Sequence, residues 1–420
     1  MIVFLRNAGQ GRDQSLHPTG DVLVPMLSSI TTLLMQGWLD WPTFTQRILY
    51  FASLFITHLL RRPIPPSPRL NFDVLNCIFR ELPTQDLHAA ALVCRQWAWA
   101  AQAPLYADLF LDTHLPNAPL LSRTMTTCPH LRPLVRSLTV TIGIDTRDTT
   151  LVDWLQLLPA NSAREFKIQQ LVYEEDFATF ILQSPFLRSI RRLECEGVFL
   201  RNGEHLERCF TLPQVRHVSL YVSHHVDDVN AISVPPALTC LSLALFHYRP
   251  MPVRLLTAVG RQLERLDLDL GHAMLDTDQM NELLHALEKY THRLRHLTIR
   301  ALARPETPYL DSIGRLIPSL EYLHLGIASF GPALFDHLPP NLCTLRLEDD
   351  YRWDFPLDEL EEFILRVGRG ESQCRSIMIF FVGYNLCDMS PYMDLAEVCG
   401  RCGVEFQFLD WLRISQWWDD

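Results

Sequence analysis

Apolar residues recur along residues 135–379 in the spacing Leu-x-x-Leu-x-Leu. Each match predicts a short strand. Because side chains alternate along a strand, the first, fourth and sixth residues of the match are expected to face the interior. Most of the shorter steps between matches fit the roughly 20–29 residue period of a strand-and-helix repeat. Residues 106–111 are predicted to add a strand before the first match. Matches or near matches begin at Val135, Ile168, Ile190, Val215, Leu238, Leu263, Leu294, Leu320, Leu342 and Cys374.

Helical patterns lie between these predicted strands. Asp276 and Gln279 have the spacing of a capping box, and an apolar stripe continues from them to residue 290. A second helix is predicted over residues 356–367, where proline stands at the start and Gly368 at the stop. Alternating strands and helices predict a parallel sheet curved into an open solenoid. A conventional α/β domain is the alternative, since its buried strands are also apolar.

Ahead of the repeats, the apolar spacing changes to that of short helices. The first predicted helix carries one stripe at i, i+3, i+4 and i+7 and ends at Pro83, and Thr84 is placed to cap the second. Two or three helices within roughly fifty residues bury little surface alone, so an apolar face that seeks a partner is expected. A helical hairpin packed on the rest of the chain is the alternative. The first stripe is Leu75, Ile78, Phe79 and Leu82, and the second helix is expected to share a face formed by Leu87, Ala91 and Cys94.

This helical segment resembles an F-box over about residues 63–111. The resemblance rests on Leu70, on Val74-Leu75-x-x-Ile78-Phe79, on Leu82-Pro83-x-x-Asp86-Leu87 and on Val93-Cys94-x-x-Trp97. Together with the repeats, the chain resembles F-box proteins with degenerate leucine-rich repeats, especially the large fungal families. The resemblance implies an all-helical F-box followed by a leucine-rich-repeat-like α/β solenoid. It also implies that the F-box binds a Skp-type adaptor held by a cullin-RING ubiquitin ligase, while the array holds a protein target.

Two sets of binding residues follow. The adaptor is expected to contact apolar F-box residues, several of which must also hold the core of the module: Leu70, Val74, Leu75, Ile78, Phe79, Leu82, Leu87, Val93 and Trp97. The target is expected on the exposed sheet face, where Tyr and Arg often dominate interface energetics. Because side chains alternate along a strand, the third, fifth and seventh positions of the middle matches are expected on this face. The predicted target-binding residues are His217, Tyr221, Arg265, Asp267, Asp269, His296, Arg300, Tyr322, His324 and Arg346.

Composition narrows the partners. A chain of 420 residues that is 48% hydrophobic is long enough for more than one module. The formal net charge of −11 argues against a nucleic-acid surface, which needs a basic patch. The 11 cysteines are mostly scattered, which favours reduced packing thiols and a cytoplasmic or nuclear location. An acidic cluster at residues 348–362 is interpreted as a solvated loop and helix face, and the steering of a basic partner is the alternative.

The N-terminal sixty residues contain apolar runs at 22–39 and 48–60. A membrane span needs about twenty apolar residues, and the second run is shorter, so no membrane association is expected. Residues 1–62 are predicted to form an apolar extension and linker, either as a helix that packs on the array or as a weakly ordered segment. The F-box is placed at 63–112, the solenoid at 113–410 and a tail at 411–420.

The sequence offers little for catalysis, and no cofactor or metal is expected. Cys399 and Cys402 form a lone Cys-x-x-Cys pair, and His224-His225 with Asp227-Asp228 suits a solvated loop better than a metal site. The predicted function is therefore a non-enzymatic, substrate-recognising subunit of an SCF-type ubiquitin ligase. The alternatives are an adaptor-independent repeat scaffold and a membrane-tethered recruiter that uses residues 22–60.

Overall fold

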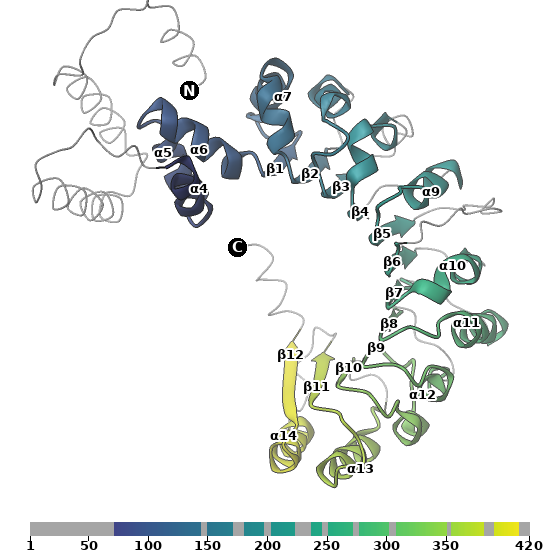
Figure 1. The fold of residues 1–420 in the computed structure, drawn as a ribbon. Coiled ribbons are helices and arrows are strands. Elements are labelled where there is room, and N and C mark those ends of the chain that lie inside the picture. Colours follow the sequence, from purple (N-terminus) through teal and green to yellow (C-terminus); the bar gives the residue numbers. More distant parts are fainter. Residues whose placement is uncertain are drawn as a thin grey trace, which may run out of the picture. The chain divides into compact units, whose positions relative to one another are not determined.

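A helical module precedes a long parallel sheet backed by helices, as a computed structural model shows (Figure 1). The residues from Phe72 onward belong to one compact unit. This architecture confirms the predicted α/β solenoid of the leucine-rich-repeat type. The structure describes residues 71–143, 149–170, 180–196, 203–222, 237–245, 251–271, 277–301, 308–350, 354–381 and 390–410. The predicted extension, linker and tail, Leu70, Asp276 and the His224–Asp228 segment therefore lie outside the described residues.

The N-terminal module consists of α4 (Phe72–Arg80), α5 (Thr84–Ala91) and α6 (Arg95–Leu105). Pro83 separates the first two helices, and it also occupies the N-cap position of α5. The prediction that Thr84 caps this helix was wrong, because Thr84 is its first helical residue. Cys94 likewise caps α6 and does not belong to α5. The missing N–H of proline costs nothing at a helix start, which explains why it is tolerated there.

Within the described residues, twelve strands form a single parallel sheet, in which they follow one another in chain order. Short strands joined through helices give this order, since a parallel neighbour needs a crossover connection. The strands are β1 (Asp108–Asp112), β2 (Ser137–Ile142), β3 (Glu165–Gln170), β4 (Arg192–Glu196), β5 (His217–Val222), β6 (Cys240–Leu245), β7 (Arg265–Asp269), β8 (His296–Arg300), β9 (Tyr322–Leu325), β10 (Thr344–Asp349), β11 (Ser376–Phe381) and β12 (Glu405–Asp410).

The strand prediction needs two corrections. The match that began at Ile168 was out of register, because Phe166 and Ile168 are the buried residues of β3 and the repeat therefore begins at Ala163. The strand β12 was missed altogether. All other matches have their fourth and sixth residues buried within a strand.

The connectors lie along the outer side of the curved sheet (Figure 1). The predicted helices over 276–290 and 356–367 are present as α11 (Thr277–Tyr290) and α13 (Leu357–Gly368). Several connectors are short 3-10 turns that begin with proline, which the periodicity analysis did not reveal. The connectors are α7 (Ala118–Thr127), η1 (Pro129–Leu134), η2 (Thr149–Leu151), η3 (Asp153–Leu157), η4 (Pro185–Ser189), α9 (Gly203–Phe210), α10 (Met251–Val259), η5 (Gly260–Gln262), α11 (Thr277–Tyr290), α12 (Ile313–Leu316), η6 (Pro332–His337), α13 (Leu357–Gly368) and α14 (Ser390–Cys402).

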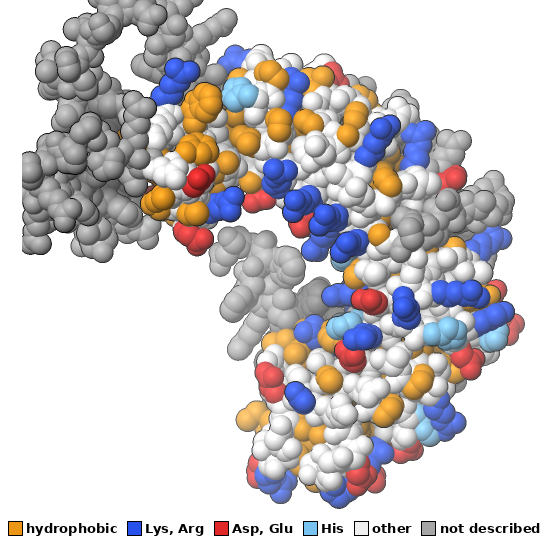
Figure 2. All heavy atoms as spheres, in the orientation of Figure 1, with side chains coloured by type: hydrophobic (Ala, Val, Ile, Leu, Met, Phe, Trp, Pro, Cys, Tyr) orange, Lys and Arg blue, Asp and Glu red, His pale blue; other side chains and the backbone are white. Residues whose placement is uncertain are grey.

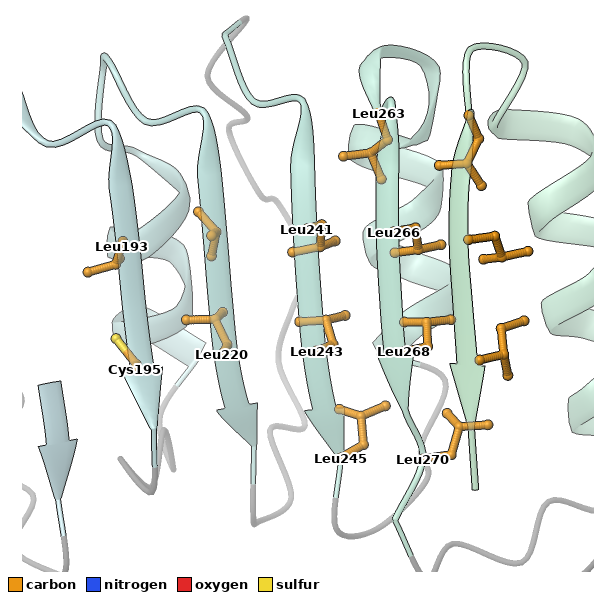
Figure 3. Packing of buried hydrophobic residues seen from close by; sticks show 14 of the residues in the cluster. Leu193, Cys195, Leu220, Leu241, Leu243, Leu245, Leu263, Leu266, Leu268 and Leu270 are labelled. Atoms are coloured by element: carbon orange, nitrogen blue, oxygen red, sulfur yellow. The ribbon is translucent and has the colours of Figure 1, made fainter. Parts of the chain in front are cut away.

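Leucine ladders form the core between the sheet and its helices. Leu241 pairs in register with Leu266, and Leu243 with Leu268, so equivalent side chains stack from strand to strand (Figure 3). All four are at most 1% exposed. The helical module has a smaller core of its own, separate from this one: Leu75, Phe79, Leu87, Ala90, Ala100 and Ala101.

A backbone pattern repeats at the residues that precede β1 to β10. The carbonyl oxygen of Arg136 accepts two N–H bonds from the next repeat, from Arg164 at 2.7 Å and from Glu165 at 3.2 Å. The carbonyl of Glu264 likewise accepts from Arg295 at 2.9 Å and His296 at 3.0 Å. These bonds join neighbouring repeats through backbone atoms, whatever side chain stands at this position. The side chain at this position is therefore available for other contacts.

Candidate adaptor and target surfaces

An exposed apolar surface covers part of the helical module. Three of the residues predicted for adaptor binding lie on it: Val74, Ile78 and Val93 are 45%, 41% and 48% exposed. Three further members were missed by the sequence analysis: Phe72, Leu92 and Trp99, which are 43%, 48% and 59% exposed. All six come from α4, from α6 or from the turn that precedes α6, and together they are named the apolar F-box surface here.

The other predicted adaptor residues lie inside the module. Leu75, Phe79 and Leu87 are buried in its core, and the half-buried Leu82 packs against that core. Trp97 is also half-buried, and its ring meets Phe79 edge to face with centroids 5.4 Å apart. Such an aromatic pair stabilises a small core beyond the area it buries. These residues therefore hold the fold of the module, while the exposed set is free to contact a partner.

The sheet brings the residues predicted for target binding onto adjacent strands. One row across the sheet is formed by the first residues of neighbouring strands, in which Arg265 pairs with His296, and His296 with Tyr322. The His296 and Tyr322 rings lie 5.6 Å apart. Burial and the neighbouring Arg192 lower the pKa of His217, which lies in the same row, and burial raises the pKa of Tyr322. Most of the ten predicted residues are half-buried, Arg265 is exposed and His324 is buried.

Ion pairs neutralise much of the charge on β7 and β8. Arg265 Nε lies 3.0 Å from Asp267 Oδ2, and an Arg300 terminal nitrogen lies 3.1 Å from Asp269 Oδ2. Pairs of this exposure contribute little to stability, about 0–1 kcal/mol. They do, however, fix the orientation of long side chains on the sheet face.

A cationic and aromatic group lies on β9, β10 and β11. The guanidinium carbon of Arg346 lies over the rings of Tyr322 and Phe380, 5.2 Å and 5.6 Å from their centroids. The His324 ring lies 5.5 Å from Phe380, and its Nε2 lies 3.2 Å from Glu348 Oε1. Cation–π attraction of this kind holds the guanidinium near the ring faces before a ligand arrives. Phe380 and Glu348 were not among the predicted residues, although both occupy the seventh position of a match.

The acidic cluster is only partly solvated. Glu348 and Asp349 are 7% and 2% exposed, so the expectation of a solvated face was wrong for these two residues. The hydroxyl of Tyr392 on α14 donates a hydrogen bond to Asp349. These two carboxylates therefore contribute to packing between repeats, whereas Asp358 and Glu362 on α13 are exposed.

Among the described residues, no group of His, Cys, Asp or Glu side chains is arranged to hold a metal ion. Cys399 is buried on α14, and this burial raises the pKa of its thiol to about 12. A thiol with a raised pKa is a poor nucleophile and a poor metal ligand at neutral pH. None of the helices in the described part of the chain is both long enough and apolar enough to cross a membrane.

Comparisons with known proteins agree with the geometry of the helical module. A family model described as F-box-like matches residues 72–112. A search of curated proteins found no match. Among solved structures, the chain is similar to one from "Crystal structure of Rad7 and Elc1 complex in yeast", with 13% identity, a TM-score of 0.37, and coverage of 86% of this chain and 90% of that chain. A likeness this distant carries no argument about function. Residues 72–112 form an F-box-like domain, and the α/β solenoid continues from it.

Proposed function

We propose that this protein is the substrate-recognition subunit of an SCF-type, cullin-RING ubiquitin ligase. In this proposal the F-box-like domain binds a Skp-type adaptor, and the sheet face of the solenoid binds a protein target. The ligase would act in the cytoplasm or the nucleus. The protein supplies proximity, which raises the effective concentration of the target near the conjugating enzyme.

The apolar F-box surface is the observation that carries this proposal. The module completes its own core without these six residues, so they are not needed to fold it. Six large apolar side chains left exposed on roughly forty residues are typical of a docking surface. The F-box-like match to the same residues supports a Skp-type adaptor as the occupant.

The target is assigned to the sheet face between β5 and β11. Tyr322, Arg346 and Phe380 provide aromatic and guanidinium groups that are already oriented by mutual contact. Residues of these types contribute strongly to protein interfaces. No neighbouring helix of the described chain covers this face, because the helices lie on the opposite side of the sheet (Figure 1).

The test is a binding assay between the full chain and a purified Skp-type adaptor. The variant combines Val74→Ser with Ile78→Ser, which removes exposed apolar area and leaves the core of the module intact. The control combines Leu157→Ser with Leu365→Ser, because these leucines are similarly exposed, 45% and 42%, but lie on η3 and α13. Both variants are first compared with the wild type by thermal unfolding.

The proposal predicts that the wild type and the control bind the adaptor, and that the F-box variant loses at least tenfold in affinity. Val74 and Ile78 are a little under half exposed, so burying the rest of each contributes about half of the 1.5–3 kcal/mol of full burial. The two together contribute about 1.5–3 kcal/mol, which is at least a tenfold effect. Failure of the wild type to bind would refute the adaptor assignment and favour a repeat scaffold. Equal losses in both variants would show that binding does not use the apolar F-box surface.

A further inference from the structure

Arginine occupies the residue before the strand in four successive repeats. These residues are Arg136, Arg164, Arg191 and Arg216, which precede β2, β3, β4 and β5. All four side chains are exposed. Figure 2 shows Lys and Arg side chains gathered along the inner border of the sheet over the same strands. These four residues are named the arginine ladder here.

The backbone spaces the ladder regularly. Each of the four carbonyl oxygens accepts two N–H bonds from the next repeat, so their Cα atoms follow the spacing of the strands. Adjacent strands lie about 4.8 Å apart, which gives the four arginines a span of about 14 Å. This length equals that of four to five residues of extended peptide, at about 3.3 Å per residue.

The ladder lacks matching carboxylates. The residues that directly follow the four ladder arginines are Ser137, Glu165, Arg192 and His217. The four ladder residues and these four neighbours therefore contain five arginines and a single carboxylate, that of Glu165. Farther into the strands, Glu194 is bound by Arg192 and by Lys167, and Glu196 is bound by Lys167 and Gln169. Within the described residues, no carboxylate lies within ion-pair distance of Arg164, Arg191 or Arg216.

At the same position in later repeats, two neighbouring side chains have opposite charges and interact. Arg295 precedes β8 and Glu321 precedes β9, and their side chains form an ion pair at 3.3 Å. Side chains at this position in successive repeats are therefore close enough to interact directly. In the ladder the equivalent neighbours are all cations, which repel one another until an anion lies between them.

We propose that the arginine ladder binds an acidic or phosphorylated segment of a target protein, laid across β2–β5. The guanidinium forks suit both carboxylate and phosphate oxygens, with which they form charge-assisted, often bidentate hydrogen bonds. A short segment fits better than a nucleic acid, because the run of cations ends after four strands on a chain of net charge −11. The inference depends on the proposed function only in naming the occupant a target.

The test measures fluorescence anisotropy of labelled peptides with the full chain. Three glycine-flanked probes have the same length and carry a run of aspartates, of phosphoserines or of serines. The variant combines Arg164→Gln with Arg191→Gln. The control combines Arg295→Gln with Arg375→Gln, which changes the net charge equally at the same repeat position outside the ladder. Unfolding curves check that both variants keep the stability of the wild type.

The proposal predicts that one or both anionic peptides bind, that the serine peptide does not, and that affinity falls as salt is raised. The ladder variant should bind about tenfold more weakly because it has lost two charge-assisted contacts, whereas the control should change by less than about twofold. The aspartate and phosphoserine arms show whether carboxylate or phosphate is preferred. No binding of either peptide, or equal losses in both variants, would overturn the proposal.

Two further measurements separate this proposal from its competitors. Tighter binding of a single-stranded oligonucleotide of equal charge than of either peptide would overturn the assignment to a protein segment. The Val74→Ser, Ile78→Ser variant should still bind the anionic peptide, and the ladder variant should still bind the adaptor. If the wild type binds the anionic peptide but does not bind the adaptor, the ligase assignment is refuted and the arginine-ladder proposal stands.

Discussion

Leu75 and Ile78 lie three residues apart on α4, yet only Leu75 is buried. The sequence placed both on one apolar stripe, together with Phe79 and Leu82, because helical spacing identifies apolar residues without showing how many faces they form. The module has two such faces, one toward its core and one toward solvent. The sequence therefore revealed the helices and most of the apolar residues, but it mixed structural with partner-binding roles and missed Phe72, Leu92 and Trp99.

Buried thiols predict how stability depends on pH. Burial raises the pKa of Cys399 from 9.0 to about 12 and that of Cys374 to about 11. The folded chain then keeps protons that the unfolded chain releases, so the free energy of unfolding falls as the pH rises above about 9. We expect denaturant unfolding between pH 8 and pH 10.5 to show this loss, and Cys399→Ala to reduce its slope. An unchanged slope in Cys399→Ala would contradict the prediction.

At the scale of single elements, the repeat pattern located the strands because buried leucines mark their fourth and sixth positions. The pattern failed at β3, where Ala163 stands in place of a larger apolar residue and the next good match lay five residues later. It also failed at β12, where Gly403 precedes the strand and no leucine begins the match. Connectors built from 3-10 turns carry too few residues to show a helical period, so they were not predicted.

Two glycines on neighbouring helices should respond oppositely to the same substitution. Gly370 follows α13 with a φ of +80°, and its N–H donates to the Val367 carbonyl at 2.8 Å. Alanine is strained at that φ, so Gly370→Ala should lower the free energy of unfolding by about 1 kcal/mol. Gly400 lies inside α14 with open space around its Cα, so Gly400→Ala should raise that free energy by about 0.5–1 kcal/mol. Denaturant unfolding of both variants measures the difference, and changes of the same sign would contradict this account.

At the scale of the whole molecule, the two separate hydrophobic cores predict two levels of stability. Phe79 is 2% exposed in the smaller core, so Phe79→Ala should cost about 3–5 kcal/mol, most of what a module this small can supply. Amide hydrogen exchange should then accelerate in α4, α5 and α6 while β7–β10 keep their protection. Phe166→Ala provides the reverse control, because Phe166 belongs to the larger core, where its ring centroid lies 5.3 Å from that of Phe186. This variant should accelerate exchange in the strands around β3 and leave α4, α5 and α6 protected. Uniform acceleration along the array in the Phe79→Ala variant would show that the cores unfold together.

The double N–H bonds to the carbonyls before β1 to β10 determine how easily the side chains at these residues can be exchanged. Because these bonds use backbone atoms only, they do not depend on the side chain at that residue, which in this chain is arginine, threonine, glutamate, cysteine or alanine. Successive residues at this position lie about 4.8 Å apart along one border. Single substitutions can therefore change the charges along this border one residue at a time without disturbing the leucine ladders. An engineer who wished to redirect the protein to a basic segment would begin by replacing these arginines with glutamates.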